Sequence, residues 1–294
     1  MAEDRSNGSS DSKVIAVPQR RRTPLPFIII AILFVVVPFL TWYLTWFGRP
    51  LTDDDIEKYL NDERNVRHVQ QALTQIEERM EKGDASVKRW YPKIVALSGS
   101  SVTEIRKTTA WVMGQDNKVE EFHAALWNLL EDPQPIVRRN AAVQLVRFQD
   151  ESGREELRAT LQPYDVPAPT SGTISVLAAG GNITENALIA RITNDQNQVQ
   201  ELRSPLPGKI TNVAAREGSK INAGDVVLTI GPDADFVYEA LRALFFIGKP
   251  EDLPDVERYA QGAEGMPDRV KQQAAATAKA IRSRNTGAKD SSTH

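Results

Sequence analysis

Few side chains of this sequence have the types and the spacing that catalysis or metal binding requires. The chain has no cysteine, which excludes disulfides, thiolate nucleophiles and cysteine-ligated metals. Its three histidines, His68, His123 and His294, lie far apart, and none stands in a metal-ligand spacing such as H-E-x-x-H. We therefore expect no catalytic residue, no metal site and no cofactor.

Two groups of acidic residues could form a site despite that expectation. His123 follows Glu120 and Glu121 on a predicted helix, which would allow a metal site, but no further ligand is in register, and a partly buried surface histidine is favoured. Glu155 and Glu156 could form an acid/base pair, yet adjacent residues face apart on a helix. A solvated helix face is the better interpretation of that pair.

Three tryptophans are the other side chains that could form a site. Trp90, Trp111 and Trp127 could line an aromatic groove, but aromatic residues at helical spacing belong more often to a buried core. The formal net charge of -3 gives no clustered basic face, so we expect no nucleic-acid partner. A length of 294 residues suggests about two domains.

An apolar run near the N-terminus predicts a membrane span. Phe27–Phe47 contains no charged residue and is close to the ~20 residues that cross a bilayer. A cleaved signal peptide is disfavoured, because the run is long and ends in bulky residues. Basic residues precede it and Asp53–Asp55 follow it, which favours a cytoplasmic N-terminus. We expect a disordered cytoplasmic tail over 1–25 and a transmembrane helix over 26–48 that contacts membrane lipid. The protein would be single-pass in the inner (cytoplasmic) membrane, with periplasmic or extracytoplasmic C-terminal domains.

Helical periodicity and an internal repeat dominate residues 52–162. Ile105–Met113 aligns with Val137–Leu145 at an offset of 32 residues, and a second helix is predicted after each. The pattern resumes over 235–284, where Val237–Leu244 and Val270–Thr277 lie 33 residues apart. The motif [IV]-R-x-x-[TA]-A resembles that of short HEAT-like repeats, which implies a solenoid of stacked helical hairpins. Residues 285–294 are expected to form a disordered tail.

Residues 163–232, between the two helical segments, have a different character. Glycine, proline and β-branched residues bound short strand-like runs, and Ala168–Ile174 matches Ser204–Ile210 at an offset of 36 residues. Gly218 and Gly224 complete the pattern in the second half, whereas Asn186 stands where the first half would have a glycine. The pattern resembles the biotinyl/lipoyl (barrel-sandwich hybrid) fold, which implies a flattened barrel of two interlocked halves.

One departure from that family bears on function. Biotinyl and lipoyl carriers attach their cofactor to a lysine at the turn between the halves, and no lysine occurs from Val119 to Gly208. Asn194, Asp195, Gln196 and Asn197 occupy the turn, and we name them as candidate partner contacts. The chain is also similar to membrane fusion protein-type periplasmic adaptors, without their long helical hairpin.

The predicted fold class is α+β multidomain: a single N-terminal transmembrane helix and an α-helical HEAT-like solenoid interrupted by an all-β biotinyl/lipoyl-like barrel. The predicted function is a membrane-anchored, non-enzymatic scaffold or adaptor that assembles with another envelope or membrane protein. Two alternatives are a membrane fusion protein-like subunit of an export or efflux system and a biotin or lipoate carrier. The missing lysine argues against the carrier.

Overall fold

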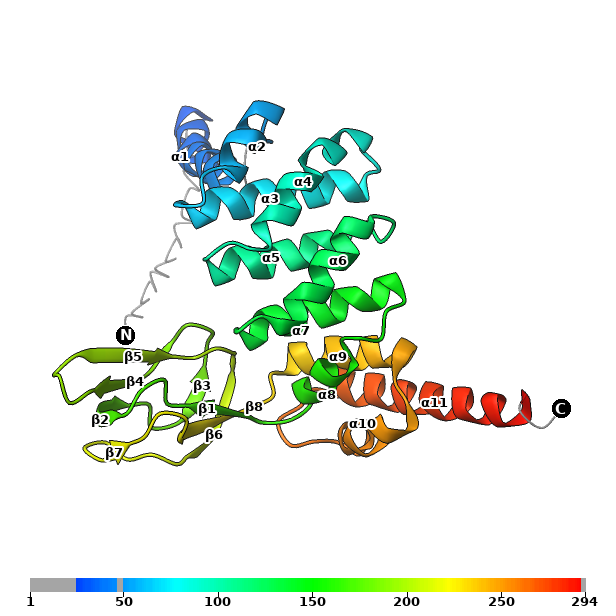
Figure 1. Cartoon of the computed structure of the whole chain (residues 1–294). Coiled ribbons are helices and arrows are strands. Elements are labelled where there is room, and N and C mark those ends of the chain that lie inside the picture. Colours follow the sequence, from blue (N-terminus) through cyan, green and yellow to red (C-terminus); the bar gives the residue numbers. More distant parts are fainter. Residues whose placement is uncertain (1–24, 47–49, 292–294) are drawn as a thin grey trace, which may run out of the picture. The chain divides into compact units, whose positions relative to one another are not determined.

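The computed structural model describes residues 25–46 and 50–291 (Figure 1). The chain divides into two compact units, one ending at Leu51 and the other beginning at Thr52. The helix α1 (Leu25–Trp46) is the only element described in the first unit, and it contains Pro38. Residues 1–24, expected to be a disordered tail, lie outside the described residues, as do 47–49 and 292–294.

The predicted membrane span requires a correction. A span needs ~20 consecutive apolar residues in a helix. Among the residues that the structure describes, no helix is both long enough and apolar enough to cross a membrane. The transmembrane helix predicted over 26–48, and the single-pass inner-membrane location with periplasmic domains derived from it, are therefore wrong.

The second unit begins with a run of short helices. They are α2 (Asp53–Leu60), α3 (Val66–Glu81), η1 (Ala85–Trp90), α4 (Tyr91–Leu97), α5 (Thr103–Met113), α6 (Glu120–Asn128), η2 (Leu129–Glu131), α7 (Pro135–Leu145), η3 (Val146–Phe148) and α8 (Arg154–Thr160). Helices α3, α5 and α7 pack against one another in succession (Figure 1). Ile105 and Val137, equivalent in the sequence repeat, are both fully buried. The chain therefore forms a stack of helical repeats, in which each hairpin buries its apolar face against the next.

An arginine in the repeat motif holds successive units together. Arg106 donates to the Ser100 carbonyl (2.9 Å), and the equivalent Arg138 donates to the Asp132 carbonyl (2.8 Å). Each arginine also pairs with a carboxylate of the following unit, Arg106 with Asp132 and Arg138 with Glu156. The motif arginine thus satisfies a loop carbonyl within its own unit and links that unit to the next.

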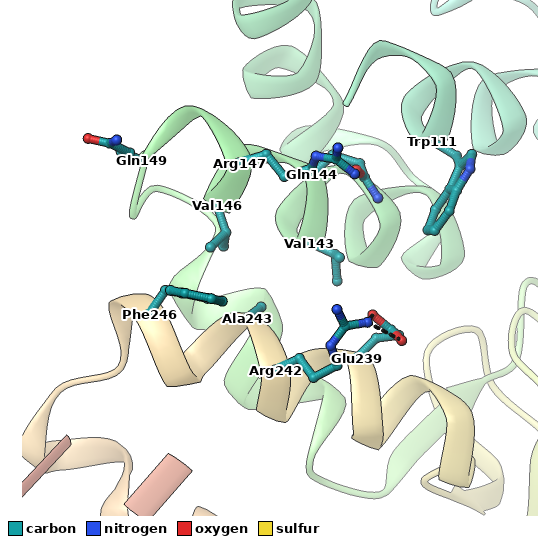
Figure 2. Close-up of a pocket in the computed structure, with 10 residues that line it drawn as sticks. All are labelled: Trp111, Val143, Gln144, Val146, Arg147, Gln149, Glu239, Arg242, Ala243 and Phe246. Atoms are coloured by element: carbon teal, nitrogen blue, oxygen red, sulfur yellow. Dashed lines mark hydrogen bonds and ion pairs between the residues drawn. The ribbon is translucent and has the colours of Figure 1, made fainter. Parts of the chain in front are cut away.

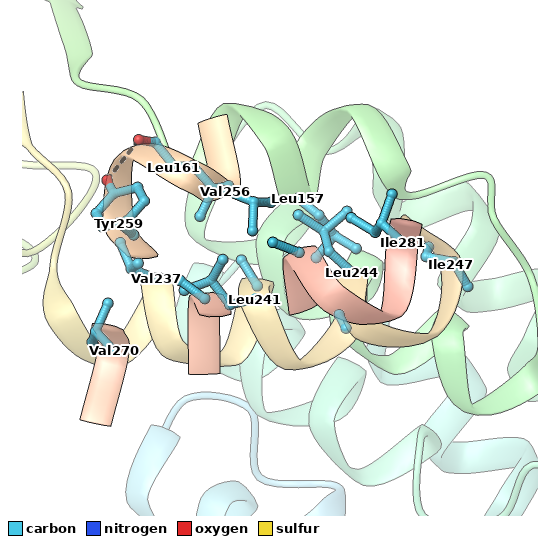
Figure 3. Close-up of a cluster of buried hydrophobic side chains, with 14 of the residues drawn as sticks. Leu157, Leu161, Val237, Leu241, Leu244, Ile247, Val256, Tyr259, Val270 and Ile281 are labelled. Carbon is cyan, nitrogen blue, oxygen red and sulfur yellow. Dashed lines mark hydrogen bonds between the residues drawn. The ribbon is translucent and has the colours of Figure 1, made fainter. Parts of the chain in front are cut away.

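Helices after the β-strands complete the stack. They are α9 (Ala234–Ile247), η4 (Pro250–Asp252), α10 (Leu253–Ala260) and α11 (Asp268–Ser291). Their apolar faces share one core with α8, in which Leu157 and Leu161 lie among Leu241, Leu244 and Val256 (Figure 3). Helix α11 continues to Ser291, past the end expected at 284.

Eight strands lie between α8 and α9. They are β1 (Tyr164–Pro167), β2 (Gly172–Leu177), β3 (Gly181–Ile183), β4 (Leu188–Thr193), β5 (Val199–Arg203), β6 (Gly208–Val213), β7 (Lys220–Ile221) and β8 (Val226–Gly231). Two antiparallel sheets result, in the orders β1-β8-β6-β3 and β5-β4-β2-β7. Each sheet contains two strands from each half of the repeat, and β3 and β7 each pair with a strand of the other half. β1 and β8 pair, with Tyr164 opposite Ile230, so the strand region begins and ends side by side.

The predicted closed barrel is wrong. Each sheet keeps two edge strands, because β3 and β7 are short and each pairs on one side only. The two sheets enclose one apolar core, which includes Ile174, Ile192 and Ile230. They are therefore two small packed sheets rather than a sheet closed on itself.

Glycines explain the repeated sequence pattern of the strands. A Cβ added to Gly172 would lie 2.4 Å from the Thr193 carbonyl oxygen, and one added to the equivalent Gly208 would lie 2.3 Å from that of Gly231. Only glycine allows the two backbones to approach so closely. Asn186, which interrupts the glycine pattern, has a left-handed φ of 63°, and asparagine is among the few non-glycine residues that adopt this conformation readily.

Candidate functional site

The turn between β4 and β5 contains the four predicted contact residues. The Oδ1 atom of Asn194 accepts bonds from the backbone N–H groups of Gln196 (3.0 Å) and Gln198 (2.9 Å). Asn194 therefore shapes the turn from inside it, as asparagine often does. Of the four predicted contact residues, Asp195, Gln196 and Asn197 are exposed.

A groove on the helical stack was not predicted as a site. Its cavity volume is about 440 Å³, and it is lined by α5, α7, η3 and α9 together with Gln149 (Figure 2). Val143 and Val146 form one side, and Ala243 of α9 lies on the other. Trp111 and Phe246 stand at opposite ends of the groove in Figure 2. The volume is within the ~300–1,000 Å³ usual for small-molecule pockets, and the walls are largely apolar.

The tryptophans do not share one environment. Trp90 is 1% exposed and belongs to the core, as expected. Trp111 is 40% exposed and Trp127 53% exposed, so the expectation of a core position is wrong for both. Trp111 lines the groove, where its Nε1 donates to Glu77 (2.5 Å). Phe246 is 68% exposed, so most of its apolar surface is in contact with water.

Two guanidinium groups stand beside the apolar walls. Arg242 pairs with Glu239 one helical turn away (3.2 Å). Arg147 is exposed, and its guanidinium makes no ion pair or hydrogen bond with any other residue that the structure describes. The groove therefore has one uncompensated positive charge. Exposed tryptophan and arginine together are the residue types enriched where proteins bind other proteins.

The wall next to Trp111 is tightly packed. Gln144 is almost fully buried, and a Cβ added to Gly114 would lie only 2.0 Å from its Oε1. That oxygen has no hydrogen-bond partner within residues 25–46 and 50–291. Gly114 thus lets the Gln144 amide fill the space between α5 and α7, which fixes the wall.

The two groups of acidic residues near His123 and at Glu155–Glu156 have structural roles. His123 Nε2 lies 2.7 Å from the Asp150 carboxylate, and its ring stacks on Phe148. The hydrogen bond to Asp150 raises the pKa of His123. Of the pair expected on a solvated face, Glu155 is exposed, whereas Glu156 is mostly buried against Arg138. No cluster of three or more potential metal ligands occurs among the residues that the structure describes.

Comparisons with known proteins assign no family to this chain. No protein-family model and no curated protein matches the chain. An engineered protein of known structure is similar over 77% of this chain and 79% of its own, at 15% identity and a TM-score of 0.40. A designed armadillo repeat protein is similar over 77% and 80%, at 14% identity and a TM-score of 0.39. A single-chain, multi-domain long-chain acyl-CoA carboxylase matches over 43% of this chain and 15% of its own, at 20% identity and a TM-score of 0.23.

The class itself follows from the packing of α3, α5 and α7: the chain is a helical repeat protein. The similarities are too distant to add detail to that class or to bear on function.

Proposed function

We propose that this protein is a non-enzymatic scaffold or adaptor that binds a protein partner in the groove lined by Trp111, Val143 and Phe246. The observation that carries the proposal is the pair of exposed aromatic side chains beside an apolar wall. Burial of such side chains by a partner contributes strongly to the binding free energy, because each removes a large apolar area from water.

A protein fits the groove better than a small molecule does. Small ligands are usually enclosed over 70–90% of their surface, whereas Trp111, Phe246 and both arginines of the groove remain open to solvent. Helical repeat stacks typically offer extended surfaces of this kind to other chains. The walls come from three successive layers of the stack, so a bound segment would contact several repeats.

In the same proposal, the β-sheets supply a second contact for the partner. Their glycine pattern resembles that of biotinyl/lipoyl domains, and the stack resembles HEAT-like repeats, so we interpret the chain as a HEAT-like scaffold with a lipoyl-like insertion. Asp195, Gln196 and Asn197 at the β4–β5 turn are exposed and offer a second contact. A carrier role is disfavoured, because this turn has no amine for covalent attachment of biotin or lipoate.

The test compares two matched aromatic substitutions. The full chain is isolated from its own host after chemical cross-linking, and the cross-linked partners are quantified by mass spectrometry. Phe246→Ala should reduce the recovery of at least one protein, because it removes an exposed ring from the groove. Trp127→Ala, which removes an exposed aromatic side chain of α6 that does not line the groove, should leave that recovery unchanged.

Equal effects of the two substitutions would contradict the proposed function, as would recovery that neither substitution changes. Circular dichroism of both variants checks that their folds are intact.

A further inference from the structure

We infer that the groove selects an acidic segment with apolar anchors, an extended peptide in which leucine-like side chains alternate with glutamate or aspartate. This inference rests on the proposed function and adds the chemistry of the partner. It is carried by the combination of apolar groove walls with a guanidinium that lacks a partner within the described part of the chain.

The apolar walls of the groove select apolar side chains in the partner. Val143, Val146 and Ala243 have no hydrogen-bonding side-chain atoms, and Trp111 closes one end. In an extended peptide, alternate side chains point the same way. Every second residue of the partner can therefore be apolar and lie between these walls, while its neighbours point out of the groove toward solvent.

The two arginines of the groove determine which charge it prefers in the partner. Arg242 already has Glu239 as a partner, so its charge is largely neutralised. Arg147 has none among the described residues, and a carboxylate placed beside it would gain a charge-assisted hydrogen bond without displacing another group. A basic segment would instead bring like charges together at Arg147, which disfavours binding.

Charge also argues against the chain's own N-terminal segment as the occupant. Residues 1–24 contain more basic than acidic side chains, with three consecutive arginines at 20–22. The chain as a whole has a net charge of -3, so the free Arg147 is a local feature. An acidic partner is complementary to this groove and not to the molecule as a whole.

The experiment uses two synthetic peptides that differ only in charge. One is a short fluorescein-labelled peptide of alternating Glu and Leu, and the other has Lys in place of every Glu. Each is titrated into the full chain and followed by fluorescence anisotropy. The Glu peptide should bind, and the Lys peptide should bind at least about tenfold more weakly, the factor expected for ~1.4 kcal/mol. The affinity for the Glu peptide should fall as salt screens the charges.

A pair of charge reversals separates a local from a general effect. Arg147→Glu should weaken the Glu peptide roughly tenfold and shift the preference toward the Lys peptide. Arg216→Glu changes the net charge equally at an exposed position of the β region that does not line the groove. It should change the affinity by less than about twofold, as ordinary surface substitutions do.

Each other outcome overturns the inference in a recognisable way. Equal binding of both peptides, or equal effects of the two reversals, would remove the role of Arg147. If neither peptide binds while the cross-linked partner still depends on Phe246, the groove binds a protein of other chemistry, and only the inference fails. If sedimentation shows self-association that Phe246→Ala abolishes, the occupant is a second copy of this chain. Loss of both peptide binding and Phe246-dependent cross-linking would remove the proposed function as well.

Discussion

Asp252→Ala should be one of the most destabilising single substitutions in the helical stack. The Asp252 side chain is fully buried, and its carboxylate accepts two bonds from Arg154, at 2.9 Å and 2.8 Å. It also accepts the backbone N–H of Lys249 at 2.8 Å. Arg154 begins α8 and Asp252 ends η4, so this pair joins helices on either side of the inserted strands.

The expected loss follows from what remains after the substitution. Arg154 is itself only 15% exposed, and removing Asp252 leaves its charge buried without its main partner. Breaking a buried pair in this way costs about 3–5 kcal/mol. For a domain of this size that is roughly 6–20 °C in Tm, a large part of the total stability of a typical domain.

The assay is urea unfolding of the full chain, followed by circular dichroism and by tryptophan fluorescence. Asp235→Ala is the matched control, because Asp235 also pairs with an arginine, Arg269, but at the surface. The control should change the free energy of unfolding by less than about 1 kcal/mol. A loss below that value for Asp252→Ala would refute the reasoning. It would mean that α8 and η4 are held together by their apolar core alone.

Three further substitutions probe other parts of the stack. Leu145→Ala should cost about 2–5 kcal/mol in urea unfolding, since Leu145 is fully buried, and an effect below about 0.5 kcal/mol would place it at the surface. Gly153→Ala should destabilise the chain, because its Cβ would lie 2.6 Å from the Ala142 Cα; an unchanged urea midpoint would contradict that contact. His123→Gln should destabilise most below the unfolded histidine pKa of ~6.5, because the Asp150 bond raises the folded pKa of His123. The difference from the original chain should shrink as pH rises through that folded pKa, and a constant difference from pH ~5.5 to ~8.5 would exclude this linkage.

The helical repeats could be predicted because their signals are local. Ile105 and Val137 recur with an arginine directly after each, and both are buried in the structure. Periodicity of this kind requires only that each helix pack against its neighbours. The strand positions could be predicted for the same reason, since Gly172 and Gly208 are needed wherever two backbones approach closely.

Closure of the strands into a barrel could not be predicted from those glycines. The glycines determine where strands cross and turn, but closure depends on pairing between sheet edges. β3 and β7 contribute few residues at those edges, so hydrogen bonding does not continue from one sheet to the other. A short strand looks the same in sequence whether it closes a barrel or ends a sheet.

The groove was missed because its walls are far apart in sequence. Trp111 and Trp90 both lie at helical spacing, and nothing near either one indicates that only Trp90 will be covered. The opposite wall comes from α9, on the far side of the inserted strands. The β1–β8 pair and the Arg154–Asp252 pair bring the two sides of that insertion together, and α9 then packs where the next repeat of the stack belongs. The groove therefore depends on long-range pairings, and its binding surface exists only once the interrupted stack has been completed.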